Sequence, residues 1–177
     1  MVLRYLLASV LAFLTIAGYS QTYDWGFGLD GVGVGFSPVF GSDISVASDD
    51  QGNVYLSGSY NGIYDFDPSQ NSVTSISFGQ SDFYVAKYDS IGHLLWVRFF
   101  GDTGNDIVYC LELDQDGQPI ISGKFNGAID FDPGPGAQII QIGPNQNIYV
   151  LKLSAEGLFQ WVKTYGAASG VGGVSIT

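Results

Sequence analysis

Residues 54–68 read Val-Tyr-Leu-Ser-Gly-Ser-Tyr-Asn-Gly-Ile-Tyr-Asp-Phe-Asp-Pro, and residues 119–133 read Pro-Ile-Ile-Ser-Gly-Lys-Phe-Asn-Gly-Ala-Ile-Asp-Phe-Asp-Pro. The second stretch begins 65 residues after the first, and Ser-Gly, Asn-Gly and Asp-Phe-Asp-Pro coincide in both without a gap. A fixed offset of this kind is the signature of an internal structural repeat. Further pairs at the same offset are Tyr84 and Tyr149, Lys87 and Lys152, and Trp96 and Trp161.

The limits of the repeat follow from one gap in the alignment. Residues 41–44 (Gly-Ser-Asp-Ile) match residues 104–107 (Gly-Asn-Asp-Ile) at an offset of 63, so the second copy holds two extra residues after this motif. We place the repeats at about 41–100 and 101–166, with a truncated third copy after them. Trp25 takes the place of the recurring Trp in a leading piece.

Each repeat is expected to form four main strands. The turn sequences at 114–117 and 154–157 put Gly where a tight hairpin needs a positive φ. No segment after residue 20 keeps a 3.6-residue apolar period, so we expect no helix there. In the second copy the expected strands are 107–113, 119–125, 147–153 and 158–165, with a short extra strand at 139–142.

The strands are too apolar for a sheet with one wet face. Residues 83–86 and 107–111 have almost no polar side, and such strands must be covered on both faces. Four-stranded sheets stacked around an axis provide that cover, which is the architecture of a β-propeller. We therefore predict an all-β fold of four-stranded antiparallel propeller blades. Propellers have about 4–8 blades, so two repeats form an incomplete ring.

The recurring motifs resemble a known family. Gly-x-Asp-Ile is followed by Asp-x-x-Gly-Asn-Val-Tyr-Leu-Ser-Gly-Ser-Tyr, by Asp-Phe-Asp-Pro, and by Asp-Phe-Tyr-Val-Ala-Lys-Tyr-Asp-x-x-Gly with a closing Trp. Over residues 41–166 this pattern is similar to the SBBP (seven-bladed β-propeller) repeat of large bacterial exported proteins. The second copy departs from it at 117–120, which read Gly-Gln-Pro-Ile. The resemblance implies a repeat scaffold at or beyond the cell surface and brings no catalytic mechanism with it.

Residues 1–20 have the pattern of a secretory signal peptide. A basic residue, Arg4, precedes an apolar run over 5–16, and residues 17–20 (Ala-Gly-Tyr-Ser) supply small residues at alternate positions before Gln21. The run is shorter than the about 20 residues that span a bilayer, although an uncleaved anchor is the alternative. We expect a secreted or cell-surface protein in which residues 21–177 form the partial propeller.

Composition excludes two classes of partner. The chain has 6 Lys and Arg against 17 Asp and Glu, a net charge of −11, and would repel nucleic acid phosphates. No later segment is long and apolar enough to span a membrane. The single cysteine, Cys110, cannot form an intramolecular disulfide.

The two Asp-Phe-Asp-Pro motifs are the candidate metal sites. In an extended segment the two Asp side chains share one side and Phe points to the other. Paired carboxylates with loop carbonyls are ligands that Ca²⁺ prefers, and calcium is the only cofactor we consider. The alternative is that each Asp caps a turn while Phe anchors the loop in the core. The candidate ligands are Asp65, Asp67, Asp130 and Asp132.

The other reactive side chains favour structural roles. His93 follows a turn glycine and is expected in an exposed loop, and Cys110 lies within an apolar strand. The recurring Trp96 and Trp161 are expected to pack in the core or between blades. The glycines at 26–35 precede no helix, so they do not predict a nucleotide site.

We therefore expect a non-enzymatic secreted or cell-surface scaffold that binds a protein or glycan partner. One alternative is a polysaccharide-acting enzyme whose carboxylates are completed by missing blades. Another is a calcium-stabilised structural adhesin. In each case we expect an N-terminal part of a longer protein, in which further C-terminal blades and the piece at 24–27 close the ring.

Overall fold

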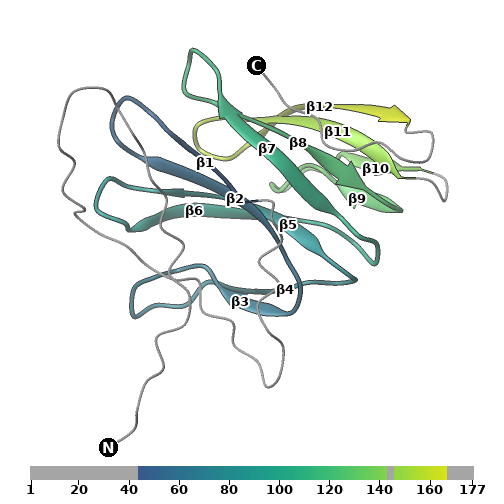
Figure 1. Ribbon diagram of the computed structural model, residues 1–177, viewed down its shortest axis with the longest axis horizontal. Coiled ribbons are helices and arrows are strands. Elements are labelled where there is room, and N and C mark those ends of the chain that lie inside the picture. Colours follow the sequence, from purple (N-terminus) through teal and green to yellow (C-terminus); the bar gives the residue numbers. More distant parts are fainter. Residues whose placement is uncertain (1–43, 143–145, 167–177) are drawn as a thin grey trace, which may run out of the picture.

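The computed structural model describes residues 44–142 and 146–166, and within these ranges every regular element is a β-strand (Figure 1). The all-β prediction and the expected lack of helix are confirmed for this part of the chain. A search of the same residues finds no helix that is long and apolar enough to cross a membrane. The predicted signal peptide and Trp25 fall outside the described residues.

The first repeat forms one four-stranded antiparallel sheet with a hairpin inserted in it. The strand order is β1-β2-β5-β6, and the two-stranded β3–β4 hairpin lies between β2 and β5 in the chain. Each main strand pairs with the main strand that precedes it, so short turns fix most of the pairing. The strands are β1 (Ser45–Ser48), β2 (Val54–Tyr60), β3 (Ile63–Asp65), β4 (Thr74–Ile76), β5 (Asp82–Tyr88) and β6 (Leu94–Phe100).

The second repeat has the same topology. Its main sheet has the order β7-β8-β11-β12, and the β9–β10 hairpin is inserted between β8 and β11. The first three predicted main strands are confirmed, and the fourth begins and ends one residue later than predicted. The strands are β7 (Ile107–Leu113), β8 (Pro119–Phe125), β9 (Ala128–Asp130), β10 (Ile139–Gln141), β11 (Asn147–Leu153) and β12 (Phe159–Gly166).

A bulge accounts for part of the extra length of the second repeat. In the β7–β8 pair, Val108 lies opposite Gly123 and Cys110 lies opposite Ser122, so Tyr109 is the additional residue. β1 pairs with β2 without such a shift. A Cβ on Gly123 would meet the Ile107 carbonyl of the bulged strand, so the close approach of the two backbones requires glycine at this position.

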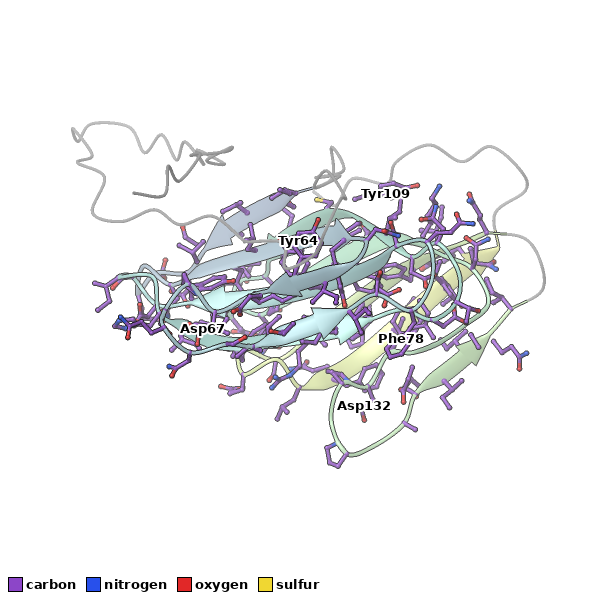
Figure 2. The ribbon with its side chains drawn as sticks, turned by 90° about the horizontal axis from the view of Figure 1, so that it is seen from below. Tyr64, Asp67, Phe78, Tyr109 and Asp132 are labelled. Atoms are coloured by element: carbon purple, nitrogen blue, oxygen red, sulfur yellow. The ribbon has the colours of Figure 1, made fainter. Side chains whose placement is uncertain are left out.

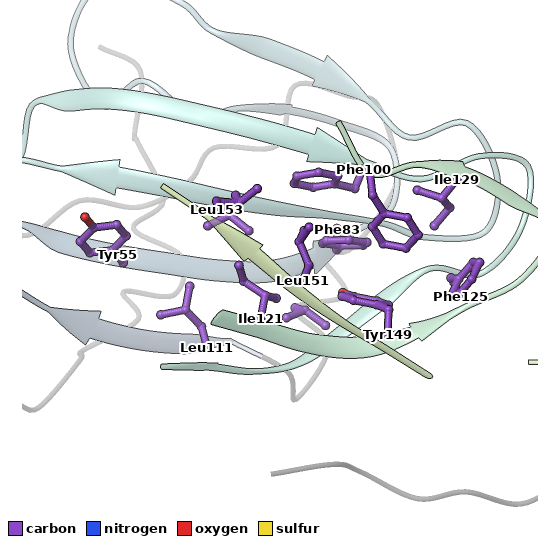
Figure 3. Packing of buried hydrophobic residues seen from close by; sticks show 13 residues of the cluster. Tyr55, Phe83, Phe100, Leu111, Ile121, Phe125, Ile129, Tyr149, Leu151 and Leu153 are labelled. Carbon is purple, nitrogen blue, oxygen red and sulfur yellow. The ribbon is translucent and has the colours of Figure 1, made fainter. Parts of the chain in front are cut away.

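The two main sheets pack face to face in a head-to-tail sense. We call the surface of the first sheet that meets the second its front face, and the opposing surface of the second sheet its back face. The shared core is fully or almost fully buried, and Figure 3 shows rings and aliphatic side chains from both sheets interleaved in it. The front-face residues include Tyr55, Phe83, Val85 and Phe100, and the back-face residues include Ile121, Tyr149, Leu151 and Leu153.

The back face of the first sheet is covered in part by its own hairpin. Tyr64 of β3 and Phe66 just after it pack against Tyr60 and Tyr84 of the main sheet. With this cover on one side and the second sheet on the other, every residue from 82 to 88 is buried. The expectation that this strand is covered on both faces is confirmed.

Candidate functional site

Side chains of β6 dock on the β11–β12 turn of the second repeat. The Trp96 indole Nε1 donates a hydrogen bond to the Ala155 carbonyl at 3.0 Å. The Arg98 guanidinium donates from Nε to the Gly157 carbonyl at 3.0 Å. A Cβ on Gly157, whose φ is +76°, would lie 2.9 Å from the Trp96 ring. Gly157 is therefore required for two reasons: the turn needs a positive φ, and the indole of Trp96 approaches closely.

The first strands of the two sheets are joined by further polar contacts. Ser45 Oγ accepts from the Leu111 amide at 3.0 Å and lies 3.3 Å from the Leu111 carbonyl. The Val108 amide donates to Ser59 Oγ at 3.1 Å, and the Tyr55 hydroxyl donates to the Gly117 carbonyl at 3.1 Å. Hydrogen bonds at both sides of the shared core fix one sheet on the other.

The recurring turn carboxylates bind backbone and lysine. Asp114 Oδ1 accepts from the amides of Asp116 and Gln118, at 3.0 and 2.9 Å. Its Oδ2 lies 2.6 Å from Lys152 Nζ. The hydrogen bond from Lys152 is the main cause that lowers the pKa of Asp114. The predicted hairpin turn, with Gly117 at a φ of +70°, is confirmed.

The first repeat has the same turn and the same ion pair. Asp49 Oδ2 lies 3.2 Å from Lys87 Nζ, and Asp49 Oδ1 accepts from the amides of Gln51 and Asn53. Partial burial opposes ionisation of Asp49, but the bonds from Asn53 and Lys87 outweigh it and lower its pKa. The ordered Asp–Lys pair therefore holds the turn against the third strand in both repeats.

The Asp-Phe-Asp-Pro motifs form capped loops between the hairpin strands. Asp65 Oδ1 accepts from the Asp67 and Val73 amides, at 3.1 and 2.9 Å. Asp130 Oδ1 likewise accepts from the Asp132 and Gln138 amides, at 3.0 and 2.7 Å. Each first Asp thus closes its own loop, as the turn-capping alternative predicts.

The second Asp and the Phe of each motif complete the loop. Asp67 Oδ1 accepts from the Ser69 amide at 2.9 Å, and Asp132 Oδ1 accepts from the Gly134 amide at 2.8 Å. Phe66 and Phe131 are fully buried, which confirms that Phe anchors the loop in the core. Figure 2 shows Asp67 and Asp132 in separate loops. The structure therefore does not bring the two pairs together.

Calcium binding by these loops stays a prediction. Among residues 44–142 and 146–166, no three His, Cys, Asp or Glu side chains are arranged so that they could hold one ion. A calcium site here would need backbone carbonyls beside each Asp pair. Calorimetric titration of the folded protein with Ca²⁺ tests the idea, and neither heat nor a thermal shift would dispose of it.

Single residues occupy the places that the sequence indicated, with one exception. His93 is exposed, and its Nδ1 lies 3.1 Å from Asp89 Oδ2. Cys110 lies in β7 and is half-buried. Trp96 packs between the sheets, as predicted, whereas Trp161 at the equivalent position remains 36 % exposed. The expectation that both Trp residues are packed is therefore wrong for Trp161, because no described segment covers that side of the second sheet.

A cluster of buried carboxylates was not predicted as a site. Asp82 begins β5, and Asp102 and Asp106 lie in the β6–β7 connection. Asp106 is fully buried and Asp82 is 3 % exposed. The sequence signal was present in the recurring Gly-x-Asp-Ile motif, but nothing in it indicated that Asp106 faces other acids.

Burial dominates the electrostatics of this cluster. Loss of solvent raises the pKa of Asp82 to about 6, and the charge of Asp102 adds to the rise. Burial likewise raises the pKa of Asp106 to about 6, although amide bonds from Asn126 and Asp102 oppose it. One oxygen, Asp82 Oδ1, has no hydrogen-bond partner among the described residues. Carboxyl groups with such raised pKa values make the free energy of unfolding depend on pH.

Comparison with known proteins adds no family to this picture. No protein-family model matches the chain, and no curated protein matches it. The resemblance to the SBBP repeat therefore rests on the motifs quoted from the sequence alone.

Proposed function

We propose that this chain is a non-enzymatic repeat scaffold of β-propeller blades, secreted or held at the cell surface, which binds a protein or glycan partner. The observation that carries the proposal is the packing of one repeat on the next, front face on back face. Because this packing is head-to-tail, the outer face of the second sheet is equivalent to the front face of the first and can receive a further copy. The alternatives with an enzymatic or calcium-dependent role gain no specific support from the described residues.

The recurring polar residues support a scaffold. Each recurring carboxylate that the structure describes in both repeats accepts backbone amide hydrogen bonds, and Asp49 and Asp114 also pair with lysine. Residues that hold turns are needed wherever the unit is copied, whereas a catalytic pair is needed once. The residues that recur in both repeats are therefore those that hold the turns of the unit.

The outer face of the second sheet has the composition expected for another contact between repeats. Its side chains stand at the positions of the front-face residues of the first sheet, yet all of them are half-buried or exposed. Lys163 replaces Arg98 there and keeps a donor for turn carbonyls, although it lacks the planar fork of arginine. The equivalent residues are Ile120, Ile148, Val150, Trp161 and Tyr165.

Extending the chain with a further copy of residues 102–166 tests this proposal. We expect the added unit to cover Trp161, shift its fluorescence to shorter wavelength and raise the stability of the second sheet. Trp161→Ala should cost less than about 1 kcal/mol in the chain as it is and about 3 kcal/mol in the extended chain, as for a buried aromatic side chain. Trp96→Ala, which removes a contact already formed, is the matched control.

An extended chain in which Trp161 stays as exposed as before would contradict the proposal, provided that the added unit is folded. Trp96→Ala with no effect on stability in either chain would contradict the contact on which the proposal rests. Urea unfolding followed by far-ultraviolet circular dichroism gives both free energies.

A further inference from the structure

Three loops meet at the carboxylate cluster where the sheets join. The Asp106 carboxylate accepts from the Asp102 amide through Oδ2 and from the Asn126 amide through Oδ1, both at 3.0 Å. The Asp106 amide donates to the Ser81 carbonyl at 2.8 Å. Asp106 therefore joins the β4–β5, β6–β7 and β8–β9 connections, which belong to both repeats.

Asp102 and Asp82 complete the junction. Asp102 accepts from the Gly104 amide at 2.7 Å and from the Ala128 amide at 2.9 Å. Asp82 Oδ2 accepts from the Phe78 amide at 3.1 Å, while its Oδ1 has no partner among the described residues and lies against Gly101. One oxygen of a residue that is only 3 % exposed thus lacks the hydrogen bond that a buried carboxylate normally has.

The charged and titratable groups that face this junction do not neutralise it. In addition to burial, the charge of Asp102 raises the pKa of both Asp82 and Asp106, and the charge of Asp82 raises that of Asp106 further. The phenols of Tyr60 and Tyr149 are close enough for the charges of Asp82 and Asp106, respectively, to raise their pKa values. The ion pairs formed in the described part of the chain join Lys87, His93 and Lys152 to other acids. An uncompensated buried carboxylate is costly unless it takes up a proton.

The second repeat shows what fits this position without a charge. Asn147 stands at the position of Asp82, and its Oδ1 faces Gly166 as Asp82 Oδ1 faces Gly101. The uncharged amide of Asn has nearly the same shape as the carboxyl group of Asp. It is therefore compatible with the same backbone. The charge of Asp82 is not required by the geometry of the unit.

We propose that the junction between the two sheets is a proton-binding site, in which Asp82 and Asp106 take up protons as the sheets pack, so that the contact strengthens at mildly acidic pH. The inference concerns the described junction alone and does not depend on the proposed function.

The direction of the effect follows from the pKa values. For Asp82 and Asp106 the folded-state pKa of about 6 lies above the ordinary value of 3.8, so the folded state binds protons more tightly. Their contribution to stability is then present below about pH 4 and is lost as pH rises through about 6. Turn acids such as Asp49 and Asp114, whose pKa values are lowered, act in the opposite sense below pH 4.

The test is the pH dependence of unfolding for the full chain and for Asp82→Asn. A shift of about two pKa units changes the folding constant on the order of 100-fold for one group. We expect Asp82→Asn to fold with a constant on the order of 100-fold larger than the unmodified chain at pH 7.5, and this advantage should fall below about tenfold at pH 4.5. Asp116→Asn, which removes one charge from an exposed turn, should keep the pH dependence of the unmodified chain.

A second measurement needs no variant. Calorimetric refolding at pH 5.5 in two buffers of different ionisation enthalpy should show net proton uptake. The same pH dependence in Asp82→Asn and the unmodified chain, or no proton uptake, would overturn the proposal. So would a rise in stability with Ca²⁺ at pH 7.5 that Asp82→Asn abolishes, because a cation rather than a proton would then neutralise the junction.

Discussion

Gly123→Ala is expected to lower the free energy of unfolding by about 3 kcal/mol or more, the upper range for overpacking in a close-packed sheet. A Cβ at this position would meet the Ile107 carbonyl and would lie 2.5 Å from the Tyr149 hydroxyl. The carbonyl belongs to the bulged β7 strand, so relief requires the backbone to move. Urea unfolding measures the loss.

The first repeat supplies the matched control. Gly58 stands at the equivalent position, but the nearest described atoms to a Cβ there belong to the Tyr84 side chain, at 2.9 Å from its hydroxyl. The tip of a side chain can move more readily than a strand backbone, so the new methyl group is accommodated more easily at Gly58. Gly58→Ala should therefore cost clearly less than Gly123→Ala. Equal losses at the two glycines would show that the bulge does not set the requirement at Gly123.

Phe83→Ala is expected to cost about 3–5 kcal/mol, the usual range for a fully buried aromatic side chain. The Phe83 ring stacks on Phe100 of its own sheet at 4.8 Å and on Tyr149 of the second sheet at 4.9 Å between centroids. Figure 3 shows the three rings in the shared core. Loss of the Phe83 ring opens a cavity between the two repeats. The two sheets should therefore separate more easily and the chain should unfold more easily.

Phe78→Ala is the control for this variant. Phe78 is 72 % exposed on the connection after β4. Replacing this exposed phenylalanine by alanine should alter the free energy of unfolding by less than about 0.5 kcal/mol. Thermal unfolding of the two variants side by side decides the matter, and a similar loss in both would contradict the placement of Phe83 at the sheet junction.

The sequence was sufficient to predict the main strands because each is bounded by a local signal. Asp-x-x-Gly turns bind their own backbone through Asp49 and Asp114, and such contacts depend on residues two to four positions apart. The repeat then confirmed each strand twice. Strands β3 and β9 escaped prediction because three residues are too few to show alternation, although the strand predicted at 139–142 is present as β10.

The junction carboxylates could not be predicted for a different reason. Asp82 begins β5, whereas Asp102 and Asp106 lie in the β6–β7 connection, and no local pattern reports that these segments come together in the fold. Asp106 belongs to a recurring motif, but Asp82 is replaced by Asn147 in the second repeat. A comparison of the two repeats therefore did not mark Asp82 as a candidate site residue. The exposure of Trp161 could not be predicted for a related reason. Trp96 packs against the second sheet, and the sequence does not show that no described segment covers Trp161 in the same way.

The central claim is that the two repeats form like sheets packed front face on back face. The most direct measurement is the set of nuclear Overhauser contacts between the ring protons of Phe83 and Tyr149. The account predicts strong contacts between these rings, which lie 4.9 Å apart and nearly parallel. Their absence from a folded chain in which the strand contacts within each sheet are intact would contradict it.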